Sequence, residues 1–201
     1  YEVGDKARLF DRRLSIDSAL FYMDWSKLQQ SVALPGGYSF FTNTGSARVY
    51  GAELDAKARP TDNLTLGISG NYTHARISST TLVNGIGPGS PIPGVPTWSG
   101  AVNSEYRWPV GNDAHAFVKG AWYFTGPSHG TFFADQTDFD RPAYSIGNAS
   151  AGMSFGKWLL SVFVNNVLDE DKIIQRPLGD VTNRAYRPWP RTVGVTASHD
   201  F

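Results

Sequence analysis

The sequence predicts an all-β fold, an antiparallel transmembrane β-barrel of which the chain forms a fragment of about nine strands. Three observations predict this fold. Apolar and polar side chains alternate with a period of two, short and long connections succeed one another, and aromatic residues gather near the ends of the alternating segments.

The composition excludes several other classes of protein. The chain has 18 Lys plus Arg against 18 Asp plus Glu, so no net charge indicates a nucleic-acid partner. The absence of cysteine excludes disulfide frameworks, thiolate zinc sites and cysteine nucleophiles. No stretch approaches the roughly 18 consecutive apolar residues of a transmembrane helix. A barrel strand needs only one apolar face.

The alternation is sharpest in two segments. In 64–74, Leu64, Leu66 and Ile68 alternate with threonine, glycine and serine. In 50–59, Tyr50, Leu54 and three alanines alternate with a glycine and four charged residues: Glu53, Asp55, Lys57 and Arg59. Because successive side chains of a strand point to opposite sides, each segment has one dry face and one wet face.

Nine segments carry this alternation and are predicted to be strands. Several match or exceed the roughly 9–11 residues that a tilted strand needs to cross a bilayer, and no helical period of comparable strength competes with them. In chain order they span about 1–10, 13–25, 40–59, 64–77, 97–108, 114–125, 143–155, 158–168 and 190–201.

The connections between these strands are of two kinds, which alternate. The short ones are 11–12, 60–63, 109–113 and 156–157. The long ones, rich in Gly, Pro, Ser and Asn, run at about 26–39, 78–96, 126–142 and 169–189. Outer-membrane barrels have short periplasmic turns and longer extracellular loops. The sequence therefore predicts a bacterial outer-membrane protein with its long loops outside the cell.

The aromatic residues of the predicted lipid-facing side form two belts, as barrels have at both membrane interfaces. The belt beside the short turns and the terminus contains Tyr106, Trp108, Phe155, Trp158 and Phe201. The belt toward the long loops contains Tyr22, Tyr50, Tyr72, Trp98, Trp122 and Phe124. The positions between the belts are aliphatic: Ile16, Ile68, Val102, Val118, Val162 and Val195.

The strand count indicates an incomplete barrel. Complete bacterial single-chain barrels have an even number of strands, and open sheet edges in lipid leave backbone groups unsatisfied. The chain also begins within strand-like sequence at Tyr1. We therefore expect an upstream partner for the first strand and a closing partner for the last.

Several segments, taken in order, resemble one known family. They are Tyr1-Glu2-Val3-Gly4 with Arg13-Leu14, 19–25 (ALFYMDW), 43–54 (NTGSARVYGAEL), 93–98 (PGVPTW), 164–169 (VNNVLD), and the terminus from 190 (PRTVGV) to Phe201. Each segment alone is a weak signal, but together they resemble TonB-dependent outer-membrane receptors over essentially the whole chain.

The resemblance implies a barrel of about 22 strands with a plugged lumen, of which this chain is the C-terminal part without the N-terminal plug. It implies active import of a scarce nutrient, a ferric siderophore or similar iron complex above all, energised through TonB. It also implies that Phe201 is the signal for the barrel assembly machinery. Two residues depart from the family pattern on the predicted lipid face: Asp5 and His199.

Two groups of residues are candidates for functional contacts. One group is predicted to face the barrel interior: Glu53, Asp55, Lys57, Arg59 and Lys119. These residues would dock the plug or line the transit path, and an ordinary hydrated barrel wall without a specific role explains them equally well. The other lies in the long loops, where it would meet an aromatic or anionic ligand: Tyr38, Phe41, Phe132, Phe133, Arg176, Arg187 and Trp189.

No catalytic residue, metal site or cofactor is predicted. Ser154 and Lys157 have the S-x-x-K spacing of penicillin-binding enzymes, but the accompanying S-D-N and K-T-G motifs are missing. The acidic run 169–171 is read as a solvated loop base in preference to a calcium site. Two other functions stay open as alternatives: a passive pore or membrane-embedded barrel enzyme, and a soluble β-sandwich binding module.

Overall fold

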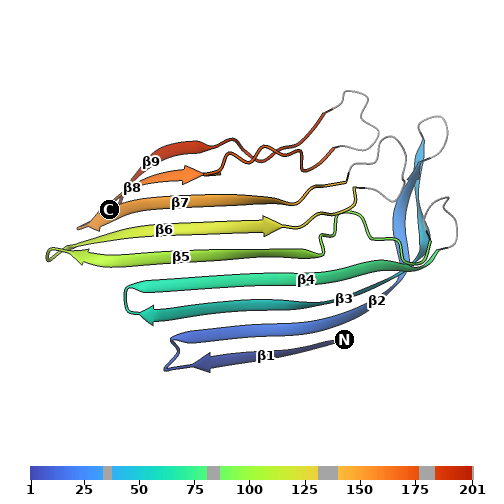
Figure 1. Ribbon diagram of the computed structural model, residues 1–201, viewed down its shortest axis with the longest axis horizontal. Helices are drawn as coiled ribbons and strands as arrows, with labels where there is room; N and C mark the ends of the chain where they lie inside the picture. Colours follow the sequence, from blue (N-terminus) through green and yellow to red (C-terminus); the bar gives the residue numbers. More distant parts are fainter. Residues whose placement is uncertain (34–37, 81–86, 131–139, 177–183, 201) are drawn as a thin grey trace.

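Nine antiparallel strands form one continuous sheet in the computed structural model, which describes residues 1–33, 38–80, 87–130, 140–176 and 184–200 (Figure 1). Each strand pairs with the next along the sequence, so β1 and β9 lie at the two edges. The predicted all-β class and strand number are confirmed. The strands are β1 (Glu2–Leu9), β2 (Leu14–Ala33), β3 (Ser39–Thr61), β4 (Leu64–Thr80), β5 (Trp98–Val110), β6 (Ala114–Thr125), β7 (Tyr144–Phe155), β8 (Trp158–Asn165) and β9 (Thr192–His199).

β2 and β3 continue far into the predicted loop 26–39, so that prediction is wrong. Their pairing runs up to Ala33 opposite Ser39. The register shifts on both sides of Leu28, and Lys27 has a φ of 57°. Such a bulge adds one residue to one strand and reverses the alternation of its faces. A period-two pattern therefore stops at the bulge although the hydrogen-bonded ladder continues.

The last two strands are shorter than predicted. β8 ends at Asn165 because Asn166 has a φ of 51° and its N–H donates to Asn148 Oδ1 at 3.0 Å. β9 begins at Thr192, after Pro190, which has no N–H to donate to a ladder.

The short connections lie at one end of the sheet and the long ones at the other (Figure 1), as predicted. The turn after β1 has positive φ values of 53°, 53° and 67° at Phe10, Asp11 and Arg12. The turns after β5 and β7 use Gly111 and Gly156, with φ of 70° and 53°, which glycine adopts without a steric penalty.

The register gives the sheet one apolar and one polar face, because directly opposed residues point to the same side. On the apolar face, Ile68 lies opposite Val102. On the polar face, Glu105 lies opposite Lys119. The two faces predicted from the alternation are therefore confirmed.

Aromatic rings pack together at both ends of the apolar face. Toward the long connections, ring centroids lie 4.7 and 4.5 Å apart in two pairs, Tyr50 with His74 and Tyr72 with Trp98. Toward the short turns, they lie 5.5 and 4.5 Å apart in Tyr106 with Trp108 and Trp158 with His199. His199 thus extends the belt beside the short turns. Phe201 lies outside the described residues.

Asp5 lies on the apolar face, as the alternation of the first strand predicts. It is directly opposite Ser18, which in turn is opposite Leu54. No side-chain hydrogen bond or ion pair holds Asp5 within the described part of the chain. The apolar face of the edge strand β1 therefore carries a carboxylate without a partner among the described residues.

Most of the apolar face is uncovered, because the described residues form one sheet without a second layer. Val193 and Val195 are 74% and 80% exposed. The small buried cluster of Leu28, Ala47 and Ile77 lies beside the bulge. A β-sandwich would cover such a face with a second sheet, so this single sheet does not fit the sandwich alternative. No helix in the described ranges is long and apolar enough to cross a membrane.

Candidate functional site

β3 carries four of the five predicted interior residues in one column on the polar face, namely Glu53, Asp55, Lys57 and Arg59. Glu53 accepts a hydrogen bond from Asn71 Nδ2 of β4 at 3.2 Å. The alternation of β3 places these side chains, and the pairing with β2 and β4 decides which charges meet.

Asp55 lies directly opposite Asp17 of β2, which puts two like charges side by side. Arg8 of β1 relieves the repulsion, since its Nη1 lies 2.7 Å from Asp17 Oδ1. The side chains of Asp55, Lys57 and Arg59 form no hydrogen bond or ion pair with the described part of the molecule. Their charges are therefore free to interact with another domain or molecule that packs against the polar face.

Lys119 belongs to a second cluster, on β5 and β6. Glu105 Oε1 is 2.9 Å from Arg107 Nη2, and its Oε2 is 3.3 Å from Lys119 Nζ. Both cations also lie over the Phe117 ring, 5.9 and 5.0 Å from its centroid. Glu105 and Arg107 were not predicted as site residues. The signal was present in the sequence, because these two charged residues flank apolar Tyr106 in the same alternation that identified the charged residues of β3.

Two hollows lie over the polar face. One has a volume of about 420 Å³ and connects Lys57 of β3 with the Glu105–Lys119 cluster of β5 and β6. Its lining also includes Thr65, Asn103 and Asn148. The other, of about 610 Å³, lies over β1 to β5; its lining includes Lys6, Asp17, Glu53, Asp55 and Asn71. This mixed-charge concave wall can dock a polar protein surface or border a hydrated path.

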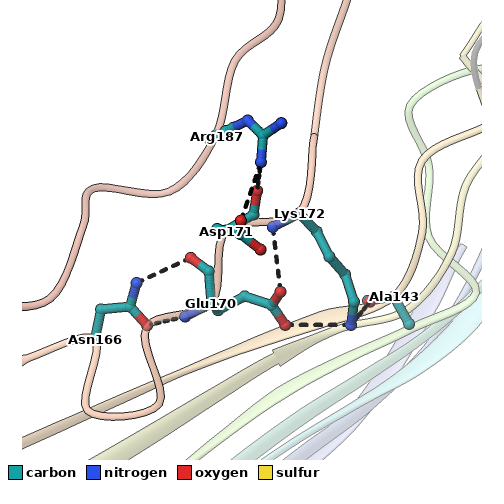
Figure 2. A network of polar contacts seen from close by, with 6 residues as sticks. All are labelled: Ala143, Asn166, Glu170, Asp171, Lys172 and Arg187. Carbon is teal, nitrogen blue, oxygen red and sulfur yellow. Dashed lines mark hydrogen bonds and ion pairs between the residues drawn. The ribbon is translucent and has the colours of Figure 1, made fainter.

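A polar junction around Asn166 begins the β8–β9 connection (Figure 2). Asn166 is only 3% exposed. Its Nδ2 donates to the main-chain oxygens of Glu170 and Trp189 at 3.0 and 2.9 Å, and its Oδ1 accepts from the Glu170 N–H at 2.8 Å. One buried amide therefore ties the two ends of the long connection together.

The acidic run 169–171 is a loop base that is only partly solvated, with Asp171 84% and Glu170 17% exposed, and each carboxylate pairs with a cation. The pairs are Asp169 with Arg191 at 3.5 Å, Glu170 with Lys172 at 3.2 Å and Asp171 with Arg187 at 3.2 Å. These ion pairs, absent from the prediction, account for the run without a calcium ion. Within the described ranges no group of three or more His, Cys, Asp or Glu is placed to hold a metal.

Lys172 fixes this junction to the start of β7. Its Nζ lies 3.2 Å from Glu170 Oε2 and donates to the main-chain oxygen of Ala143 at 3.1 Å (Figure 2). Burial alone would raise the pKa of Glu170, but the hydrogen bonds and charge of Lys172 outweigh it and hold that pKa below its usual value.

The loop candidates lie in two separate places. Exposed Tyr38 precedes β3 and exposed Phe41 lies near its start. Arg187 and Trp189 lie in the β8–β9 connection, as does Arg176, next to the bridge between Gln175 and Tyr186. Phe132 and Phe133 lie outside the described residues.

Trp189 borders an aromatic hollow at the polar junction. Its side chain is 88% exposed and lines, with Tyr144, Phe163 and Asn165, a hollow of about 660 Å³. Tyr144 and Phe163 were not predicted, because they line one hollow with Trp189 only through contacts between segments that are distant in sequence.

Comparison with known proteins agrees with this architecture. A family model described as "TonB dependent receptor-like, beta-barrel" matches residues 1–167. Similar solved structures include the ferric yersiniabactin uptake receptor FyuA from Yersinia pestis, with a TM-score of 0.82 and 22% identity. The closed form of the ferric-catecholate import receptor Fiu from E. coli K12 has a TM-score of 0.77 and 23% identity. The copper transporter OprC has a TM-score of 0.70 and 17% identity.

All three alignments cover 100% of this chain but only 29%, 27% and 30% of the respective proteins. The chain therefore spans less than a third of the length of each. At these sequence identities the likeness shows a common fold.

Proposed function

The chain belongs to the TonB-dependent receptor β-barrel family, and on that premise we propose that it is part of an outer-membrane receptor that actively imports a scarce nutrient. The observation that carries the proposal is the two-faced sheet. Its apolar face has aromatic pairs at both ends, and its opposite face carries charges. A barrel with lipid outside and a polar interior requires both faces.

We place the chain in the C-terminal part of a barrel of about 22 strands with a plugged lumen. The alignments to less than a third of FyuA, Fiu and OprC support this size. Further strands would pair with the open edges of β1 and β9. The N-terminal plug and the contact with TonB would be supplied by the rest of the protein.

The proposed orientation puts the short turns in the periplasm and the long connections outside the cell, as in outer-membrane barrels generally. Lipid would cover the apolar face. The barrel assembly machinery would read the last strand, β9, together with Phe201, which follows it by two residues in the sequence.

The plug would meet the polar face. The charges of Asp55, Lys57 and Arg59 have no side-chain partner among the described residues and support this contact. Glu53 of the same strand and Lys119, which lines one hollow with Lys57, add further charges to this face. Charges of both signs favour one orientation of a docked partner through electrostatic complementarity.

An iron complex, a ferric siderophore above all, is the proposed cargo. FyuA and Fiu are named for ferric complexes, whereas OprC is named for copper. Exposed aromatic and cationic residues at the end of the sheet that carries the long connections support a ligand with aromatic or anionic groups: Tyr38, Phe41, Trp189, Arg187 and Arg176. The protein would act as a transporter, without catalytic residues or a cofactor.

Growth of a strain lacking the whole receptor tests this proposal. Supplying the full-length gene is expected to restore growth on a panel of ferric siderophores under iron restriction, and removal of TonB is expected to abolish that growth. Growth that persists without TonB would indicate a passive pore. Rescue under copper restriction alone would contradict the iron assignment.

A further inference from the structure

We propose that a pocket between the β4–β5 and β6–β7 connections binds a group with negatively charged oxygens, a carboxylate or a phosphate. The pocket has a volume of about 320 Å³, and its lining includes Arg76, His129, Asp140 and Arg141. The β4–β5 and β6–β7 connections, between which it lies, are at the end of the sheet that carries the long connections (Figure 1). The inference rests on one part of the proposed function, namely that this end of the sheet faces the cell exterior.

Main-chain hydrogen bonds hold one wall of the pocket against β4. The Ile77 N–H donates to the Ser90 oxygen at 2.9 Å, and the Ile92 N–H donates to the Ala75 oxygen at 3.2 Å. The β4–β5 connection therefore folds back along β4 as a short added ladder, with Arg76 opposite Pro91.

The other wall is the base of the β6–β7 connection. Ser128 and Arg141 exchange two main-chain hydrogen bonds, at 3.1 and 2.8 Å. The Gly94 N–H donates to the His129 oxygen at 2.8 Å and so joins the two walls. A site built on bonded backbone loses little conformational freedom when a ligand arrives.

The cations of the pocket are incompletely neutralised. Arg141 lines the pocket, and its guanidinium has no hydrogen-bond or ion-pair partner among the residues that the structure describes. Arg76 makes one long hydrogen bond, to the Gly89 oxygen at 3.4 Å. The Asp140 carboxylate is already engaged by His129 Nδ1 at 2.9 Å. The pocket therefore carries two guanidinium groups against one engaged carboxylate.

Gly94 lets the backbone come close to Arg141. Its φ is +76°, and a Cβ at this position would lie 3.0 Å from Arg141 Nη1. Any side chain here would be strained and would press on the guanidinium. The planar guanidinium can bind two oxygens of a carboxylate or phosphate at once.

Two kinds of molecule can bring such a group to this end of the barrel: an anionic solute, which includes the cargo, and the headgroup of an anionic membrane lipid. They share the chemistry that the pocket recognises. The experiment must therefore test the anion site first and separate its sources second.

The test uses inorganic phosphate and citrate with the purified full-length receptor, at constant ionic strength adjusted with chloride. The thermal unfolding midpoint is followed against ligand concentration, since a ligand that binds the folded state raises it. Arg141→Gln is expected to weaken binding and so to raise the apparent dissociation constant about tenfold or more. Arg12→Gln, which removes an equal charge at the opposite end of the sheet, is the control and should bind like the wild type.

Gly94→Ala is a second variant that keeps every charge. It should weaken binding in the same direction by displacing the guanidinium, so the test survives if Arg141→Gln does not fold. Equal affinity in the wild type and in either variant would overturn the proposal. The proposal would also be overturned if neither phosphate nor citrate raised the unfolding midpoint of the wild-type receptor more than chloride does.

Vesicles separate the two sources. The receptor is reconstituted in neutral phosphatidylcholine and in the same lipid with anionic phosphatidylglycerol. If dissolved phosphate or citrate stabilises the receptor in neutral vesicles, and does so only when Arg141 is present, the ligand of the pocket is a solute. If only phosphatidylglycerol stabilises it, the ligand is a lipid headgroup. None of these measurements requires transport, so a failure of the proposed transport function would be seen separately.

Discussion

Asp169 and Arg191 close the base of the β8–β9 connection: the Arg191 N–H donates to Asp169 Oδ1 at 2.9 Å, and the guanidinium lies 3.5 Å from Asp169 Oδ2. Arg191 Nη1 also donates to the Val167 oxygen at 3.3 Å. The contact joins two sequence motifs, 164–169 and the segment that starts at Pro190. Together with Asn166 it fixes both ends of a long connection to the end of β8.

Replacing Asp169 by alanine is expected to loosen this base. The substitution removes the acceptor of the Arg191 N–H, and such a hydrogen bond contributes about 1 kcal/mol. Protease cleavage within 170–190 of the folded receptor should become faster. Asp171→Ala is the control, because its carboxylate is 84% exposed and such an ion pair contributes little. Equal cleavage rates in the two variants would contradict the role given to Asp169.

Leu54 and Glu53 are adjacent in β3 but point to opposite faces. Leu54→Arg puts a charge on the lipid face, at about 2–4 kcal/mol near the bilayer midplane, and should block assembly into the membrane. Glu53→Ala removes one acceptor of Asn71 on the polar face and should assemble normally. The measurement is the fraction of heat-modifiable, folded receptor in outer-membrane preparations. Equal tolerance of both substitutions would contradict the assignment of the faces.

Asp5 is expected to be a destabilising residue. It stands on the apolar face opposite Ser18, and a carboxylate in lipid is unfavourable by less than the roughly 2–4 kcal/mol of a cation. Asp5→Val should therefore raise the unfolding midpoint of the full-length receptor, and Ala7→Val is the control on the same face of β1. A lower midpoint for Asp5→Val would instead reveal a partner of the carboxylate on a neighbouring strand.

Gly147 is expected to tolerate no side chain, because Trp122 occupies the space in front of it. A Cβ at this position would lie 2.7 Å from the indole ring. Gly147→Val should shift Trp122 and destabilise the barrel by about 1–3 kcal/mol, seen in denaturant unfolding. Gly120→Val is the matched control on the same face, since its Cβ would meet only Ser104 Oγ at 3.6 Å. Similar midpoints for the two variants would refute the packing of Trp122 on Gly147.

The two faces and the strand order could be predicted because period-two alternation is a local property of each strand. The alternation could not predict the bulge at Lys27 and Leu28, because an inserted residue shifts the phase of the apolar–polar pattern while the strand pairing continues. The ion pair of Arg8 with Asp17 depends on the register between β1 and β2, which the turn sets.

The loop structures were harder to predict, because they depend on contacts distant in sequence. Asn166 bonds to Trp189, 23 residues away. The anion pocket requires the β4–β5 and β6–β7 connections to meet at Gly94 and His129. Neither contact leaves a periodic signal in the sequence.

The central claim is that alternate residues of β3 face lipid and a polar interior, and spin labelling along 52–58 of the full-length receptor in membranes tests it most directly. The chain contains no cysteine, so each label can be attached at one introduced cysteine. Collision rates with molecular oxygen, which concentrates in lipid, should be high at positions 52, 54, 56 and 58 and low at 53, 55 and 57. Rates that do not alternate, or that are high at the odd positions, would contradict the account.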